Sequence, residues 1–420
     1  MKYFGKKWDL KMKMKNTYNF KKNNKKYQIK HIAFISSNYP STLYPNNGTF
    51  VQQLIRAIAR IGIKCTIISP VSIFNRRHGK LPPKISIDST INENSIKVLR
   101  PRFLSFSSKP FFNLNTFYLT QIAFNKAVFR SLSYLDFPVD ILYGHFIYPS
   151  GYSAVHFAKK LGITSIVSCG ESVCFNNKKL WSVEPIGYQK AIHDFKQVSG
   201  IIAVSSLLKE ILQYKLKIPE EKIKVFPNGV DLNLFYPLNK YKMRKKHGLP
   251  LDKTIIVFVG HFENRKGPQR VLEAVKGLKN IGIVFIGGGN MPLESENILF
   301  KGILKHSLIP EMLSAGDFFV LPTLEEGSCN AIIEAFACGL PVITSNGKFN
   351  DDIINDEVAM NIDPLNVVQI RNAIIKLMND RELRNKMSLE AVKWARNFDI
   401  DIRVRNIVEW MNIIIKNNNV

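Results

Sequence analysis

Cysteine is scarce in this chain, and the few cysteines present form no recognisable framework. The five of them are odd in number and scattered, without the spacing of zinc ligands or of a small disulfide-rich domain. No apolar run approaches the roughly 18 residues needed to span a bilayer, and the N-terminus lacks the apolar core of a secretory signal. These absences predict a reduced protein of the cytoplasm.

Acidic residues are also few: 33 Asp and Glu stand against 59 Lys and Arg, which gives a formal net charge of +26. Part of the excess is local, because residues 1–30 contain eleven lysines and a single acidic residue, Asp9. Aromatic residues are interleaved with these lysines, as in segments that bind anionic membrane surfaces or nucleic acid. We expect residues 1–28 to form a basic, disordered tail that attaches to a membrane surface. A tail without function is the alternative, and nucleic acid is the least favoured partner.

The length of 420 residues is enough for two domains with substantial cores. Short apolar segments that end in turns alternate with helical patterns, which is typical of parallel α/β sheets. The first such unit is a strand at 30–36, a turn-rich loop that ends at Gly48, a helix at 49–61 and a strand at 64–69. It lacks the G-x-G-x-x-G pattern, so it does not indicate a dinucleotide-binding domain.

Residues 318–345, FFVLPTLEEGSCNAIIEAFACGLPVITS, are the most informative stretch of the chain. They predict a strand at 318–321, a loop, a helix, and a second strand at 342–344. In such a unit a ligand binds in the crevice at the carboxyl end of the first strand.

The loop and helix start of this unit combine two kinds of polar group. The N–H groups of residues 327–330 should open the helix, with Ser328 or Asn330 as N-cap, and a helix start of this kind attracts phosphate. Glu326 and Glu334 lie beside this helix start. Because a carboxylate repels phosphate, the expected ligands of these two residues are uncharged groups such as sugar hydroxyls. The combination predicts a nucleotide-sugar site.

Two motifs resemble a known family. The pattern E-x7-E followed by A-x-A-x-G-x-P-V-I, at 326–343, is similar to the signature of retaining glycosyltransferases of family 4. The string PNGVDLNLFYP, at 227–237, resembles a second hallmark of the same family. The resemblance implies the GT-B fold, an α/β architecture of two Rossmann-like domains that face each other across a cleft.

The same resemblance implies roles for individual residues. The implied donor-binding residues are Gly48, Gly260, Arg265, Lys266, Gly327, Ser328, Cys329, Asn330 and Glu334. Lys266 and Arg265 would hold the diphosphate and Glu334 the ribose. Glu326, on the sugar hydroxyls, and His145, facing the transferred sugar or the acceptor, are the candidate catalytic residues. Backbone geometry explains Gly48 equally well, and a histidine at a strand end is often structural.

The chain departs from the family pattern at three positions. Cys169 and Ser172 occur where many members carry the histidine and the aspartate of His-Gly-x-Asp. His261 replaces an arginine that usually follows the strand glycine, and we expect Arg265 to compensate for it.

The predicted domains are a tail at 1–28, an acceptor-side domain at 29–237, a linker at 238–250 and a nucleotide-sugar domain at 251–398. Residues 399–420 should form a helix that crosses back to the first domain.

The predicted activity is retaining, metal-independent transfer of a sugar from a nucleotide-diphosphate sugar to a glycan or lipid-linked acceptor. Cell-surface polysaccharide or glycolipid synthesis is the expected setting, in the cytoplasm or at the inner face of the membrane. No cofactor and no specific nucleic acid are expected. The alternatives are a GT-B nucleotide-sugar epimerase, an inactive relative, and a non-enzymatic basic protein that binds nucleic acid or membranes.

Overall fold

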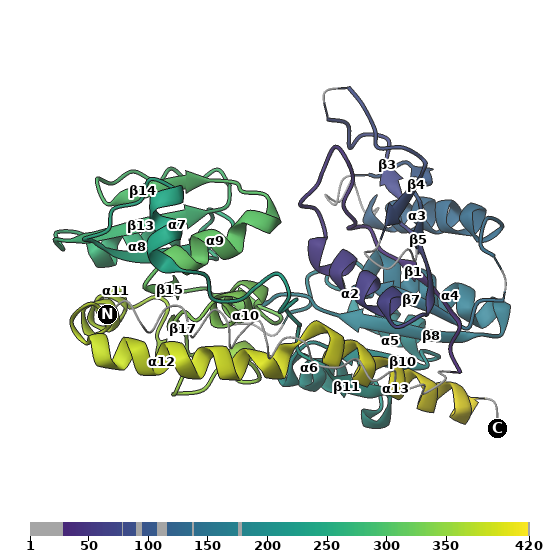
Figure 1. Ribbon diagram of the computed structural model, residues 1–420. Helices are drawn as coiled ribbons and strands as arrows, with labels where there is room; N and C mark the ends of the chain where they lie inside the picture. The colour runs from purple at the N-terminus through teal and green to yellow at the C-terminus, as the bar shows by residue number, and fades with distance from the viewer. Residues whose placement is uncertain are drawn as a thin grey trace.

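The computed structural model describes residues 28–77, 79–89, 95–106, 116–136, 138–174 and 179–418. The predicted tail at 1–28 therefore lies outside the described residues, apart from its last position. Within the described part of the chain, two parallel sheets with helices on both faces make up two domains (Figure 1), which confirms the predicted α/β class.

The first domain is built on an eight-stranded sheet in the order β11-β10-β8-β7-β1-β2-β5-β4. Neighbouring strands are parallel except β4, which pairs antiparallel with β5 at one edge. The strands are β1 (His31–Ile35), β2 (Lys64–Ile68), β4 (Ile85–Ser89), β5 (Ser95–Leu99), β7 (Ile141–His145), β8 (Thr164–Cys169), β10 (Gly200–Ala203) and β11 (Ile223–Val225). Its helices are α2 (Thr49–Arg60), α3 (Thr116–Leu132), α4 (Tyr152–Leu161), α5 (Tyr188–Phe195) and α6 (Ser206–Leu216), with short turns η1 (Ile147–Gly151) and η2 (Glu220–Lys222).

The second domain is built on a six-stranded, fully parallel sheet in the order β14-β13-β12-β15-β17-β18. The strands are β12 (Thr254–Val259), β13 (Ile281–Ile286), β14 (Ile298–Gly302), β15 (Phe318–Leu321), β17 (Val342–Ser345) and β18 (Ala359–Ile362). Its helices are α7 (Lys240–Lys246), α8 (Pro268–Val275), α9 (Ile309–Ala315), α10 (Asn330–Ala337), α11 (Val367–Asn379) and α12 (Arg381–Trp394), with short turns η3 (His306–Leu308), η4 (Lys348–Asn350) and η5 (Ala395–Phe398).

The central strands of both sheets are buried along their whole length because helices cover both of their faces. Every residue of β1, β7 and β8 is buried, as is every residue of β13, β15 and β17. Among the cysteines whose surroundings the structure describes, Cys65, Cys169, Cys329 and Cys338 are buried free thiols.

The chain crosses between the domains twice, and the two crossings lie side by side. Phe226 packs in the core of the first domain and Val230 in that of the second; on the return, Phe398 belongs to the second core and Ile400 to the first. The N–H of Val230 donates to Phe398 O at 2.8 Å, and the N–H of Ile400 donates to Val230 O at 3.0 Å. The connection is therefore a hydrogen-bonded pair of segments.

The last helix, α13 (Ile400–Asn418), returns to the first domain. In Figure 1 the yellow helices α12 and α13 follow each other along the base of both domains, with α13 beneath the first. Its buried side chains Val404, Ile407, Val408 and Met411 join the core formed by α2 and the strands β1 and β7.

The predicted linker at 238–250 differs from the structure. Residues 240–246 form α7, and Arg244 is buried against the second domain, where its guanidinium donates to Asp317 Oδ2 at 2.6 Å and to Ala315 O at 2.9 Å. Because Phe235 and Leu249 also belong to the second core, this segment is part of the second domain.

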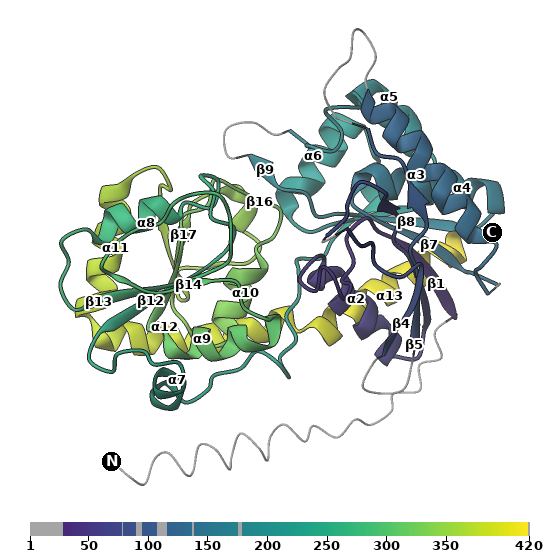
Figure 2. The same ribbon diagram turned by 90° about the horizontal axis from the view of Figure 1, so that it is seen from above.

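Two short sheets complete the fold. β3 (Val71–Ser72) pairs with β6 (Arg102–Phe103) inside the first domain. β9 (Val173–Cys174), from the first domain, pairs antiparallel with β16 (Glu325–Glu326), from the second, and both labels lie at the junction of the domains in Figure 2. No helix of the described segments has the length and hydropathy that crossing a membrane requires.

Candidate active site

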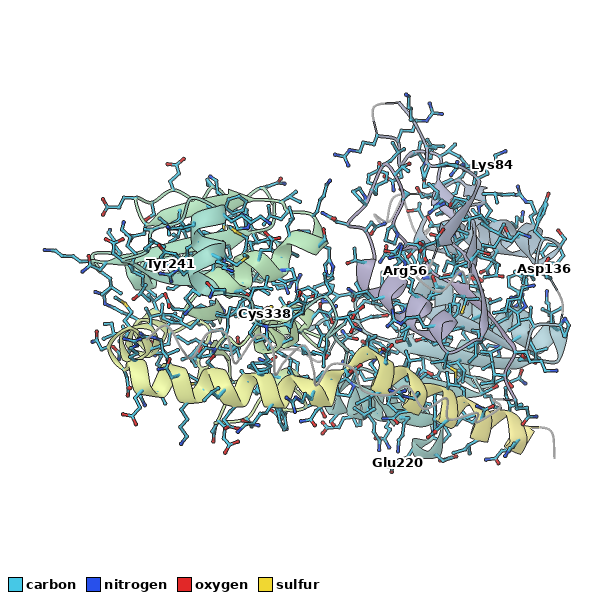
Figure 3. The ribbon with its side chains drawn as sticks, viewed as in Figure 1. Arg56, Lys84, Asp136, Glu220, Tyr241 and Cys338 are labelled. Carbon is cyan, nitrogen blue, oxygen red and sulfur yellow. The ribbon has the colours of Figure 1, made fainter. Side chains whose placement is uncertain are left out.

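The candidate site residues lie where the carboxyl ends of parallel strands from both domains meet. β12 leads into the loop with Lys266, β15 into the loop with Glu326, and β7 ends at His145. The domains touch here: a Cβ atom added to Gly327 would lie 2.7 Å from Glu171 O, so only glycine allows this approach. Figure 3 labels Arg56, on α2 of the first domain, and Cys338, directly after α10 of the second domain.

Lys266 and Glu326 form an ion pair at the centre of the second-domain side. The Lys266 ammonium donates to Glu326 Oε1, and the two side chains are only 12% and 9% exposed. Thr323 Oγ1 donates to the same oxygen at 3.2 Å. Burial opposes the charged form of Lys266, but the neighbouring Glu326 carboxylate outweighs burial and raises the pKa of the lysine. Lys266 is therefore charged at neutral pH.

A second pair joins Glu334, on α10, to His306, in η3. The imidazole Nε2 lies 3.3 Å from Glu334 Oε1, and the ring packs edge-on against Phe235 with centroids 5.2 Å apart. Burial lowers the pKa of His306, yet the hydrogen bond and charge of Glu334 reverse that effect and raise it. The carboxylate predicted to hold ribose thus has a titratable partner.

The start of α10 differs from the prediction at its cap. The N-cap is Cys329 rather than Ser328 or Asn330, and its side chain makes no capping hydrogen bond. Ser328 serves the domain junction instead, because its hydroxyl accepts from the N–H of Asn228 at 3.1 Å and its carbonyl accepts from Asn228 Nδ2 at 2.9 Å. The Asn330 side-chain oxygen is buried without a partner. Burial raises the pKa of Cys329 to about 12, so this residue is a neutral thiol.

Arg265 has other partners in this structure. Its guanidinium donates to Glu325 O at 3.0 Å and to Glu263 Oε1 at 2.7 Å. Gly260 packs against the alkyl chain of Lys266, and His261 is exposed. Lys266 is therefore the better placed of the two predicted cations.

His145 is buried at the end of β7 on the first-domain side. Its ring lies 5.5 Å from the Phe50 ring and 4.7 Å from the Phe146 ring, and its Nδ1 atom has no hydrogen-bond partner. Burial, with a smaller effect of the Arg403 charge, lowers the pKa of His145 to about 3. The imidazole is therefore neutral at physiological pH.

The backbone next to His145 is strained. Phe146 has φ 71° and ψ 156°, a conformation that residues other than glycine rarely adopt. Such strain costs about 1–3 kcal/mol and is concentrated at functional sites. The Phe146 N–H, which donates to Ser168 O at 2.8 Å, helps to hold the strained turn.

Gly48 begins α2 at φ 73°, and a Cβ atom there would lie 2.6 Å from the backbone of Asn38. Backbone geometry alone thus requires a glycine. The same loop reaches the second domain, where Asn46 Nδ2 lies 3.5 Å from Leu304 O, close in sequence to His306.

Of the three departures from the family pattern, only Cys169 is fully buried; Ser172 is half-buried and His261 is exposed. Cys169 is buried, and burial raises the pKa of its thiol. Next to it, the Glu171 carboxylate accepts from Ser182 Oγ at 2.5 Å and from the N–H of Ile147 at 3.1 Å. Burial raises the pKa of Glu171 in spite of these hydrogen bonds.

Sequence reasoning missed four residues that shape the site: Thr323, His306, Glu171 and, as a side chain, Asn228. Only Asn228 had a usable signal in the sequence, because it lies in the recognised turn PNG. Thr323, His306 and Glu171 come close to the site only through the fold. Across the described residues, no cluster of three or more His, Cys, Asp or Glu side chains could hold a metal ion. The site presents one buried cation, two carboxylates, an uncapped helix start and a neutral imidazole.

Comparisons with known proteins agree with this geometry. Residues 48–234 match the family model of Glycosyltransferase Family 4, and residues 239–394 match that of glycosyl transferases group 1. The two matches meet between residues 234 and 239, a few residues after the chain first crosses to the second domain.

Two named relatives are similar over most of the chain. One is the Bacillus subtilis (strain 168) glycosyltransferase TuaC, named for teichuronic acid biosynthesis, which is 27% identical over 75% of this chain and 80% of its own length. The other is the Escherichia coli UDP-Gal:alpha-D-GlcNAc-diphosphoundecaprenol alpha-1,3-galactosyltransferase, 30% identical over 60% of this chain and 69% of its own length.

Solved structures share the fold at low identity. The sucrose-phosphate synthase of Thermosynechococcus elongatus superimposes with a TM-score of 0.72 at 18% identity, covering 90% of this chain and 97% of that one. Anabaena HepE in complex with UDP-glucose superimposes with a TM-score of 0.66 at 15% identity, covering 91% and 99%. The two-domain arrangement is thus that of known glycosyltransferase structures.

Proposed function

This chain belongs to glycosyltransferase family 4 and is a glycosyltransferase with the GT-B fold, and from that premise we propose the details of its reaction. It moves a sugar from a nucleotide-diphosphate sugar to a lipid-linked or glycan acceptor. The sugar keeps its anomeric configuration, and no metal ion takes part.

The observation that carries the proposal is the buried Lys266–Glu326 pair between the ends of β12 and β15. A lysine ammonium has three N–H donors, and Glu326 is its acceptor in this structure, so further donors can reach a diphosphate without breaking the pair. The uncapped start of α10 supplies further N–H groups for the same phosphates. Together they stabilise the charge that develops on the leaving group.

In the proposed step, the bond between the anomeric carbon and the diphosphate oxygen breaks, and its electron pair leaves with the diphosphate. The acceptor hydroxyl oxygen bonds to the anomeric carbon on the same face, and its proton passes to the departing phosphate oxygen. Glu326 is held by Lys266 and Thr323 and serves as an acceptor for sugar hydroxyls. It is a substrate-binding group in this scheme, and no covalent intermediate forms on it.

His145 contributes hydrogen bonding in this scheme. A pKa of about 3 makes the imidazole a poor proton carrier at neutral pH, so a neutral ring with one nitrogen free of partners is what it offers. The ring can orient the transferred sugar or the acceptor without adding charge.

The acceptor class rests on the relatives. The E. coli relative is named for a sugar-diphosphate-undecaprenol acceptor, and TuaC for teichuronic acid biosynthesis. We extend this to a lipid-linked acceptor in polysaccharide or glycolipid synthesis, with the enzyme peripheral to the membrane. The high net charge of +26 supports a location at an anionic surface.

The test begins with a thermal-shift panel of nucleotide sugars, because a donor that binds only the folded state raises the unfolding temperature. The stabilising donor is then incubated with a lipid-linked acceptor, and the product linkage is read by NMR. We expect transfer with retention that EDTA leaves unchanged. Inversion, or activity lost on EDTA and restored by Mg²⁺, would contradict the corresponding part of the proposal.

Two variants connect the activity to the site. Lys266→Met and Glu326→Gln should each lower kcat/KM at least about a hundredfold, as expected for loss of one preorganised electrostatic contact. Glu325→Gln, the adjacent residue, is the matched control and should keep wild-type activity. Donor incubated without acceptor also distinguishes the epimerase alternative, which would yield an isomerised nucleotide sugar.

A further inference from the structure

A hollow apolar surface lies on the first domain, away from the residues of the candidate site. Helix α3 buries one face against the domain through Phe124 and Val128, and its opposite face is exposed. Leu119 and Ile122 lie on that exposed face, together with Leu104 and Phe106 from the segment after β6. These four apolar side chains line a groove of about 440 Å³, within the range of about 300–1,000 Å³ for ligand sites.

Three cations line the same groove. Lys126 and Arg130 follow Ile122 at helical spacing and are exposed, and neither pairs with any carboxylate of the described residues. The third is Arg102, in β6; its Nη2 donates to Pro82 O, while its Nη1 is buried without a hydrogen-bond partner.

The groove opens at the functional end of the first domain. β3 follows the carboxyl end of β2, and β6 follows the carboxyl end of β5. Because β2 and β5 run parallel to β1 and β7, these extensions lie at the same end of the sheet as Gly48 and His145. In Figure 1, β3 and α3 are both labelled in the upper part of the first domain.

We infer that this α3 surface (Arg102, Leu104, Phe106, Leu119, Ile122, Lys126 and Arg130) docks the enzyme on an anionic phospholipid bilayer. An exposed apolar patch rimmed by Lys and Arg is the pattern of surfaces that lie in the membrane interface, where apolar groups enter the acyl boundary and cations meet the headgroups. Charge complementarity favours a membrane occupant, since the three cations bring no carboxylate with them.

The inference rests on the proposed function for its purpose: docking by this surface would turn the acceptor side of the cleft toward a lipid-linked acceptor. The α3 surface belongs to the folded first domain and is distinct from the predicted basic tail.

The test uses the full chain and vesicles of phosphatidylglycerol and phosphatidylcholine. Lys126→Glu/Arg130→Glu should lower the partition coefficient at least about tenfold at 0.15 M salt, because each cation near an anionic surface contributes about fivefold. Arg381→Glu/Lys386→Glu, on exposed positions of α12, is the charge-matched control and should weaken binding far less.

A second pair of variants isolates the apolar part. At about 0.5 M salt, where surface charges are screened beyond a few Å, Leu119→Gln/Ile122→Gln should remove most of the residual binding. Leu389→Gln/Ile413→Gln changes exposed residues of the same types on α12 and α13 and should leave it unchanged.

A fluorescence reporter shows which surface meets the lipid. Phe129, on α3, is 62% exposed and Tyr214, on α6, is 75% exposed. Phe129→Trp should gain quenching from vesicles with brominated acyl chains, and Tyr214→Trp should not.

Unchanged vesicle binding in the α3 variants, or equal quenching at the two positions, would overturn the inference. If instead vesicle binding is unchanged but KM for a lipid acceptor rises, the groove holds the acceptor chain; if a dimer dissociates, it is a subunit interface. Both results also refute membrane docking. Donor-induced thermal shifts and transfer to a soluble acceptor should be the same in these variants as in the wild type. If the wild type itself shows neither the thermal shift nor transfer, that result counts against the proposed function and not against membrane docking.

Discussion

Removing the charges of the Lys266–Glu326 pair one at a time and together measures how strongly the two halves of the donor site depend on each other. Both side chains are nearly buried, so truncating one partner leaves the other as an uncompensated charge. Such single changes cost about 3–5 kcal/mol, whereas replacing both charges by neutral groups of similar size is often close to neutral. We expect Lys266→Met and Glu326→Gln each to lose at least about 3 kcal/mol and the double variant to lose about 1 kcal/mol or less.

The assay is thermal or urea unfolding of the donor-free protein, followed by a double-mutant cycle. For a unit the size of the second domain, about 3 kcal/mol corresponds to a fall in Tm of roughly 6–12 °C. The exposed pair Lys393–Glu390 on α12 is the control, and its coupling should be only a few tenths of a kcal/mol. If the two single losses simply add in the double variant of the buried pair, the residues are not coupled and the central observation fails.

Three further results are expected. The pKa of His145 falls from 6.5 to about 3 on folding, so the unfolded state binds more protons than the folded state between these pH values. The wild type should therefore lose about 2 kcal/mol of stability between pH 7.5 and pH 5. The His145→Gln variant should lack this loss, and a pH profile of unfolding identical to that of the wild type would disprove the prediction. The raised pKa of His306 has the opposite effect: its pairing with Glu334 is complete below pH 6.5 and is lost as pH rises through the folded pKa. Loss of the pair leaves Glu334 free to bind the donor ribose. Donor affinity, measured by titration calorimetry, should therefore rise with pH in the wild type and depend less on pH in His306→Gln. Asn228→Ala should leave the carbonyl of Ser328 unpaired at the domain junction, cost about 1 kcal/mol and raise the donor KM severalfold, while an unchanged KM would mean that this contact does not affect donor binding.

Local signals in the sequence were sufficient for the two parallel strands of the unit at 318–345. The strand β15 has the predicted bounds, and β17 extends one residue beyond its predicted end. These bounds could be predicted because nearby turn residues and glycines mark where each apolar strand begins and ends. The closing helix was likewise expected within 399–420 and is observed at 400–418.

Elements stabilised by distant partners could not be predicted in this way. Helix α7, KYKMRKK, has almost no apolar residues, and it is fixed by Arg244 reaching Asp317, 73 positions away. The strand β16 exists only because β9 of the other domain pairs with it. The region between 70 and 138 carried no recognised motif, and the structure places α3 and four short strands there.

In the candidate site too, local motifs identified residues, but contacts between distant segments could not be predicted. Glu326 and Lys266 could be named from their motifs, but their direct contact, 60 positions apart, depends on β12 and β15 being neighbours in the sheet. The partner of Glu334, His306, comes from a turn without a recognised motif. The assigned roles of these residues stay predictions until the variants are measured.

The return of α13 to the first domain has a consequence for biosynthesis. Val404, Ile407, Val408 and Met411 cover a face of the sheet whose first strand was made about 370 residues earlier. At a translation rate of about 5–20 residues per second, that face stays uncovered for roughly twenty seconds or more after β1 is made. The second domain, whose segments are contiguous between the two crossings, can complete its core before then. The nascent chain should therefore mature out of order, with its second domain finished first and its first domain dependent on chaperones until the final helix leaves the ribosome.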